Sequence, residues 1–147
     1  MQELNDNNNL SGITNEGLNE LEINSLQEKY NNGNSFPLSF REFLIIGGKS
    51  EGTGAVYYDF DALFEDLEEA IEYSGFKIER PFFVFDKLDS QFSGFFLDEN
   101  NPDPNVYIYD PFGHKEENIP LLRPADGFTF SSLIKESIRR VKLGLAP

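Results

Sequence analysis

The residues in this sequence that could do chemistry are carboxylates, and they are most concentrated between positions 59 and 72. That stretch contains no lysine or arginine, and at helical spacing Glu65, Glu69 and Glu72 share one face. Like charges at this spacing destabilise a helix slightly, so the run is either a solvated face or a face kept acidic to capture a basic partner. Its acidic residues are Asp59, Asp61, Glu65, Asp66, Glu68, Glu69 and Glu72.

The sequence does not support a catalytic site. His114 is the one histidine and cysteine is absent, so neither a histidine–cysteine metal cluster nor a cysteine nucleophile can form. No Gly-x-Ser-x-Gly motif offers a serine that His114 could activate. With 26 Asp and Glu residues, any carboxylate pair chosen as an acid and base would be arbitrary. We predict no catalytic residue, and a hydrolase is the least supported alternative.

Two loop-like stretches resemble a calcium-binding and a phosphate-binding motif, but neither has the residues that its motif requires at the required positions. Residues 98–109 are acidic, but the glycine and the final glutamate of a calcium-binding EF-hand loop are missing. Residues 47–56 are rich in glycine, but they lack the phosphate-loop spacing and lead from a helix into a strand. We predict no cofactor and no metal, and Asp98 and Asp103 join the run (Asp59, Asp61, Glu65, Asp66, Glu69 and Glu72) as candidate partner-binding residues.

The formal net charge of −14 narrows the class of partner. Nucleic acids and anionic membranes attract basic surfaces, so neither is expected to bind. The charge either keeps the protein soluble or meets a basic protein. No signal-like segment and no apolar run long enough to span a bilayer is visible, so we expect a cytoplasmic protein.

The apolar pattern predicts one α+β domain over residues 15–147, preceded by a flexible polar tail over 1–14. The expected order is α-α-β-α-β-β-β-α, with the helices packed on a single antiparallel sheet. Residues 111–127 are expected to form a loop and an irregular connector. Helices are expected at 15–30, 37–46, 61–74 and from Phe130 to Val141, and strands at 55–60, 81–87, 91–99 and 106–110.

The most informative stretch is residues 36–48, "FPLSFREFLIIGG". Pro37 suits the first turn of a helix, the aromatic and aliphatic residues line one side, and Gly47 or Gly48 can close the helix in a left-handed conformation. Asp61 is the expected N-cap of the next helix, and Gly75 its expected end.

These features resemble the SUKH superfamily, which includes bacterial immunity proteins and the yeast cell-wall synthesis regulator. Residues 36–48 are similar to the family's lead motif, and "SGFFLDENNPDPNVYIYD", with Gly94, is similar to its central hairpin. "FTFSSLIKESI" is similar to its C-terminal helix. Phe40 stands where a tyrosine is common, and tryptophan is absent. The likeness spans roughly residues 15–143.

The resemblance implies binding and not catalysis. It leads us to expect an immunity protein that neutralises a cognate toxin domain, often a nuclease and therefore basic. The alternative that the same family offers is a constitutive adaptor with several partners, like the yeast regulator. The family's motif residues are mainly structural, so they do not locate the interface.

Overall fold

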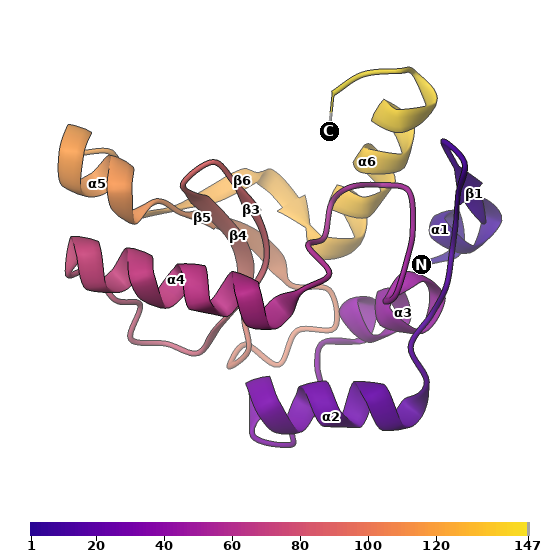
Figure 1. Ribbon diagram of the computed structural model, residues 1–147, viewed down its shortest axis with the longest axis horizontal. Coiled ribbons are helices and arrows are strands. Elements are labelled where there is room, and N and C mark those ends of the chain that lie inside the picture. The colour runs from indigo at the N-terminus through magenta and orange to yellow at the C-terminus, as the bar shows by residue number, and fades with distance from the viewer. Residues whose placement is uncertain (147) are drawn as a thin grey trace.

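The computed structural model describes residues 1–146 and alternates helices with two antiparallel sheets (Figure 1). The helices are α1 Gln2–Asp6, α2 Glu20–Asn31, α3 Leu38–Gly47, α4 Phe60–Ser74, α5 Pro111–Glu117 and α6 Phe130–Lys142. The strands are β1 Asn9–Leu10, β2 Ile13–Thr14, β3 Phe82–Leu88, β4 Gln91–Phe96, β5 Asn105–Tyr109 and β6 Leu122–Thr129. The predicted α+β class is confirmed.

The larger sheet is an antiparallel meander in the order β3-β4-β5-β6. Gly94 of β4 pairs with Val84 on one side and Tyr107 on the other. A Cβ atom at Gly94 would lie 2.4 Å from the carbonyl oxygen of Phe83, so glycine lets the first two strands approach this closely. The hairpins predicted between the strands are therefore present.

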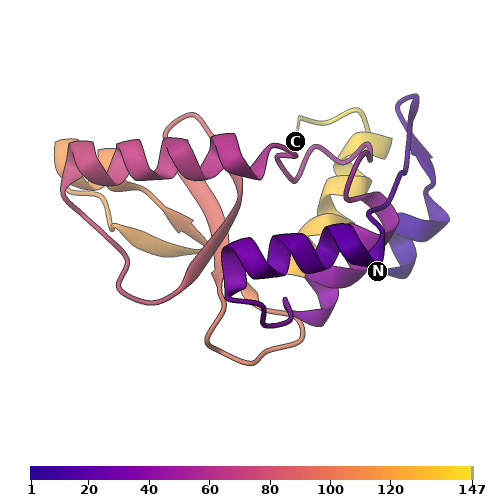
Figure 2. The ribbon, with the colours of Figure 1, turned by 60° about the horizontal axis from the view of Figure 1, so that its bottom comes forward.

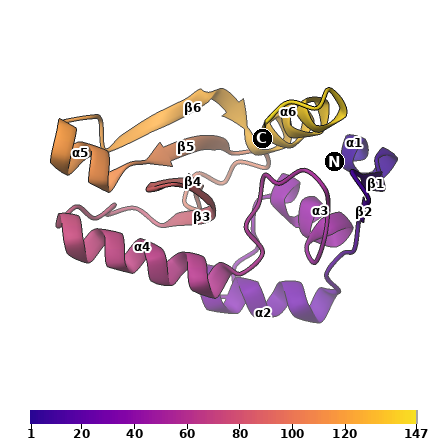
Figure 3. The same ribbon diagram turned by 45° about the horizontal axis from the view of Figure 1, so that its top comes forward.

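The helices form two groups around this sheet. Figures 1 and 3 show α4 running alongside β3, with α5 near its C-terminal end and α2 near its N-terminal end. Helices α3, α6 and α1 gather at the opposite end, where α1 contacts both of the others (Figure 2). The C-terminal end of α2 meets the N-terminal turns of α4, where Lys29 and Tyr30 contact Asp61 and Phe64 (Figures 1 and 3).

The core is centred on the ring of Phe40, which is fully buried. Six other phenylalanine rings lie with their centroids 5.1 to 6.4 Å from it, many of them edge to face. These rings come from the loop before α3 and from α3, α4, β3, β4 and α6: Phe36, Phe43, Phe60, Phe83, Phe95 and Phe130. Helix α3, within the stretch 36–48, thus supplies the ring around which the other elements pack.

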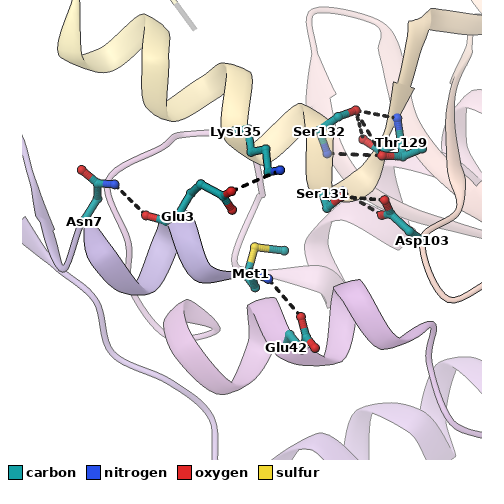
Figure 4. A network of polar contacts seen from close by, with 9 residues as sticks. All are labelled: Met1, Glu3, Asn7, Glu42, Asp103, Thr129, Ser131, Ser132 and Lys135. Atoms are coloured by element: carbon teal, nitrogen blue, oxygen red, sulfur yellow. Dashed lines mark hydrogen bonds and ion pairs between the residues drawn. The ribbon is translucent and has the colours of Figure 1, made fainter.

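The first fourteen residues differ from the flexible tail that we expected. They form α1 and the β1–β2 hairpin, and Leu4 and Leu10 are buried in the core. Figure 4 shows how α1 is held: Glu3 pairs with Lys135 of α6 at 3.1 Å, and the amino group of Met1 contacts Glu42 of α3. Leu4, Leu10 and the partly buried Met1, together with these two ion pairs, dock a segment that is mostly polar.

Three local predictions are wrong in ways that have a physical cause. Residues 55–60, predicted as a strand, form none: 55–59 are irregular, with a single backbone hydrogen bond from the Tyr57 N–H to the Phe85 carbonyl, and Phe60 begins α4. Residues 111–117 form α5, since the Asp110 side chain accepts from the Gly113 N–H and Pro111 fits the first turn. Residues 122–129 form β6, an edge strand whose register shifts opposite β5.

The residues that cap α3 and α4 also differ in part from those predicted. Gly48 has φ −64°, and Gly47 is not in the left-handed region either. Both are needed for close packing, because a Cβ at Gly48 would lie 2.8 Å from Leu18 and one at Gly47 2.9 Å from Glu51. Asp59, and not Asp61, caps α4, whereas Gly75 ends that helix at φ +76° as predicted.

Replacing the central ring tests the core assignment. Phe40→Ala removes a fully buried ring from between several elements, and we expect it to lower the free energy of unfolding by about 3–5 kcal/mol. The measurement is chemical denaturation followed by circular dichroism. Leu21→Ala is the matched control, because Leu21 is 78 % exposed and its loss should cost less than about 0.5 kcal/mol. Equal losses in the two variants would contradict this core.

The carboxyl group of Asp86 gives a test of pH dependence. It follows the register shift in β3, and burial raises its pKa to about 6, although the backbone N–H of Lys87 lowers it somewhat. Because an unfolded aspartate has a pKa of about 3.9, the folded state binds this proton more tightly and loses stability as pH rises from about 4 to 6.

Asp86→Asn should therefore stabilise the protein at pH 7.5 by about 1–3 kcal/mol and change little at pH 3.5. Urea unfolding at the two pH values is the measurement. A stability difference that is the same at both values would show that the carboxyl does not titrate with folding.

Candidate functional site

Helix α4 carries the acidic run predicted from the sequence, and it presents most of it to solvent. Leu63, Leu67 and Ala70 are buried on the inner face of the helix. The glutamates on the other faces, Glu65, Glu68, Glu69 and Glu72, are exposed. The predicted acidic face is therefore present.

Three aspartates of the run are engaged in local contacts. Asp59 accepts from the Ala62 N–H at 3.0 Å, and Asp66 pairs with Lys87 of β3 at 3.2 Å. Asp61 pairs with Lys29 of α2 at 2.5 Å. Within residues 1–146, by contrast, none of the four exposed glutamates of α4 forms an ion pair. These four are available to an outside cation.

A groove runs between α2 and α4 and joins this acidic face to the body of the protein. Its volume is about 570 Å³. We call it the acidic groove and define it by its lining residues, Lys29, Tyr30, Asp61, Phe64, Glu65 and Glu68. A second hollow shares Lys29 and Asp61 and continues past Glu22 and Leu26 towards Tyr58.

One wall of the acidic groove is aromatic and is anchored in the core. The rings of Tyr30 and Phe64 stack with centroids 4.6 Å apart. Both also contact Phe83 of β3, at 5.9 and 5.5 Å. The contacts with Phe83 hold the wall against the sheet, and the Tyr30 hydroxyl also reaches Asp61 at the rim.

The polar rim centres on Asp61. Its Oδ1 atom accepts hydrogen bonds from the Lys29 ammonium and from the Tyr30 hydroxyl. The Lys29 bond, followed by the Tyr30 bond, holds the pKa of Asp61 below its ordinary value. Burial, followed by the hydrogen bond to Asp61, raises the pKa of Tyr30. At neutral pH the groove therefore presents an ionised carboxylate next to a neutral phenol.

The structure separates Asp98 and Asp103 from this site, since neither lines the acidic groove. Asp98 accepts from Arg80 at 2.7 Å, and the Arg80 guanidinium lies 3.8 Å from the centre of the Phe96 ring. Asp103 accepts from the backbone N–H and the hydroxyl of Ser131, at 2.9 and 2.6 Å, at the start of α6 (Figure 4). Each residue has a structural role in tying a loop to its neighbour.

The sequence pattern did not reveal Lys29, Tyr30 and Phe64 as site residues. Tyr30 and Phe64 carry the apolar periodicity of their own helices, which is the ordinary signal of core packing. Lys29 is separated from Asp61 by 31 intervening positions. The aromatic wall exists only because the fold brings α2 and α4 together.

The part of the chain that the structure describes contains no group of three or more histidine, cysteine or acidic residues placed to hold a metal ion. None of its helices is both long and apolar enough to cross a membrane. No protein-family model matches the chain, and a search of curated proteins gives no significant match. The site is therefore described by its geometry alone: an acidic helix face beside a groove with an aromatic wall.

The structural role of Asp103 can be measured through pH. Partial burial would raise its pKa, but hydrogen bonds from Ser131, with smaller contributions from Thr129 and Ser39, together outweigh burial and lower it. A depressed pKa in the folded state contributes stability that is present above the unfolded pKa of about 3.9 and is lost as pH falls through the folded pKa.

We expect Asp103→Asn to lower stability by about 1–2 kcal/mol at pH 7, because it replaces charge-assisted hydrogen bonds with neutral ones. The difference from wild type should shrink as pH falls below 4. Urea denaturation at pH 7 and pH 2.5 measures it. A partner-binding role without a structural one would leave the stability of the variant unchanged at both values.

Proposed function

We propose that this chain is a non-enzymatic binding protein that neutralises a basic toxin domain, which it docks on the exposed face of α4 and at the acidic groove. The single observation that carries the proposal is the row of exposed glutamates on α4 without an ion pair in residues 1–146: Glu65, Glu68, Glu69 and Glu72. The resemblance of the sequence to immunity proteins of the SUKH superfamily supports the same function.

Electrostatics supports a basic protein as the partner. Nuclease toxins bind phosphates and carry basic surfaces, which a chain of net charge −14 attracts over several ångströms of solvent. The same charge repels nucleic acids and anionic membranes. We place the complex in the cytoplasm, where such a toxin would find nucleic acid substrates.

The exposed side of α4 carries only negative charges, and this uniform sign also supports a basic partner. Like charges at adjacent helical turns destabilise α4 slightly, whereas lysines placed among them would form stabilising pairs. A helix that keeps only one sign of charge on its exposed side is suited to recognising a surface of the opposite charge.

The test is a double charge reversal, Glu69→Lys with Glu72→Lys, on the outer face of α4. The probe is a purified basic nuclease domain of the proposed toxin class, whose association rate is measured at low and at high salt. We expect the rate at low salt to fall about tenfold or more and its dependence on salt to flatten. Circular dichroism checks folding, because exposed substitutions change stability by less than about 0.5 kcal/mol.

The matched control is Glu79→Lys with Glu117→Lys, which reverses the same number of exposed charges outside α4. It should slow association less than the α4 variant does. If both double variants slow association equally, net charge alone acts and α4 is not the docking face. If several unrelated basic proteins bind as tightly as the toxin domain does, the chain is an adaptor of the regulator type instead.

A further inference from the structure

We propose that the acidic groove receives one arginine side chain of the partner, and that its guanidinium displaces Lys29 from Asp61. This inference rests on the proposed function and adds the chemistry that recognises the partner. It specifies what enters the groove, whereas the observation that carries the proposed function is the row of four exposed glutamates on α4, of which Glu65 and Glu68 also line the groove.

Lys29 shows that the groove accepts a cation. Its ammonium lies 2.5 Å from Asp61 Oδ1 and 5.6 Å from the centre of the Tyr30 ring. The side chains of Lys29 and Asp61 are 57 % and 65 % exposed, so water screens the pair and its members can separate at little cost. Lys29 is thus a resident cation that a better-fitting one can replace.

The groove offers more acceptors than Lys29 uses. Lys29 and Tyr30 both donate to Oδ1 of Asp61. Among residues 1–146, the other oxygen of Asp61 and the carboxylates of Glu65 and Glu68 accept no hydrogen bond. A ligand with several donors in one plane would satisfy them, and a guanidinium has five such donors.

The aromatic wall also favours arginine over lysine. A guanidinium is planar and weakly hydrated, so it stacks on aromatic faces, which an ammonium does less well. Tyr30 and Phe64 stack on each other beside the carboxylates, and the Lys29 ammonium already lies over the Tyr30 ring, 5.6 Å from its centre. An ammonium from the partner would only exchange one lysine for another, whereas a guanidinium gains both the stacking and the additional hydrogen bonds.

Other occupants fit less well. The part of the chain that the structure describes holds no three-ligand cluster for a metal. An apolar side chain would leave Asp61, Glu65 and Glu68 facing it without compensation, and an anion would be repelled by them. The charge and the aromatic wall together select a cation with a flat face.

The test uses the full chain and two probes, an acetylated hexa-arginine peptide and an acetylated hexa-lysine peptide. Isothermal titration should give tighter binding for the arginine peptide. Lys29→Met removes the resident cation and keeps its aliphatic stem. We expect this variant to bind the arginine peptide about two- to fivefold more tightly than wild type does, which is the range set by the loss of an exposed competing ion pair.

Lys135→Met is the matched control, because Lys135 is equally exposed, pairs with one glutamate and changes the net charge by the same amount. It should tighten binding less than Lys29→Met does. In wild type, the ring resonances of Tyr30 and Phe64 should shift in NMR spectra on titration with the arginine peptide, and less with the lysine peptide. This second measurement needs no variant to fold.

Equal effects of the two methionine variants, equal affinities for the two peptides, or unshifted Tyr30 and Phe64 resonances would each overturn the arginine site. The proposed function would survive that result if the α4 double reversal still slowed association with the toxin domain. The two proposals can therefore fail separately.

Discussion

The contact on which the rest of the structure depends is the packing of aromatic rings around Phe40. This ring touches residues of α3, α4, α6 and the first two strands of the large sheet, so it joins elements that are far apart in the sequence. Phe60, at the first turn of α4, lies 5.5 Å from Phe83, which in turn lies 5.1 Å from Phe40. The direction of α4 is set by this cluster, and with it the place of every carboxylate that the helix carries.

The acidic groove is an outward extension of the same packing. Phe83 contacts the core on one side and the rings of Tyr30 and Phe64 on the other. Aromatic contacts bury large areas and restrain geometry, so the wall of the groove is preorganised before any charged partner arrives. The charged residues at the rim are exposed and held by weak ion pairs, and they can rearrange. A rigid apolar wall with an adjustable polar rim is a combination suited to capturing a side chain.

The sequence predicted those helices and strands whose apolar residues recur at regular spacing within the element itself. The helices around Phe40, Leu63 and Ile134 have apolar residues at helical spacing, and strands β3 to β5 have enough apolar residues to stand out from the turns between them. Strand β6 contains Pro124, Asp126 and Gly127, which read as loop residues, and its pairing with β5 is a long-range event that no local pattern records.

The sequence predicted the acidic residues of the candidate site but not its aromatic wall or the partners of Asp61. The carboxylates of α4 lie on one element, and a helical repeat is enough to place Glu65, Glu69 and Glu72 outside. The partners of Asp61 come from α2, and the aromatic wall requires Tyr30 and Phe64 to meet, which depends on tertiary packing. Asp103 shows a structural role that the sequence did not indicate, because this loop aspartate accepts hydrogen bonds that hold the start of α6.

In the proposed complex the two halves of the site act at different distances. The exposed glutamates of α4 act through solvent, where charges are felt over roughly 8 Å at physiological ionic strength, so they speed the encounter with any basic surface. They cannot tell one basic protein from another. Discrimination needs direct contact, and the groove supplies it, since a side chain that enters it must fit beside both the aromatic wall and Asp61. A chain with an acidic helix alone would bind basic proteins promiscuously, and the aromatic wall is the feature that makes a cognate partner physically reasonable.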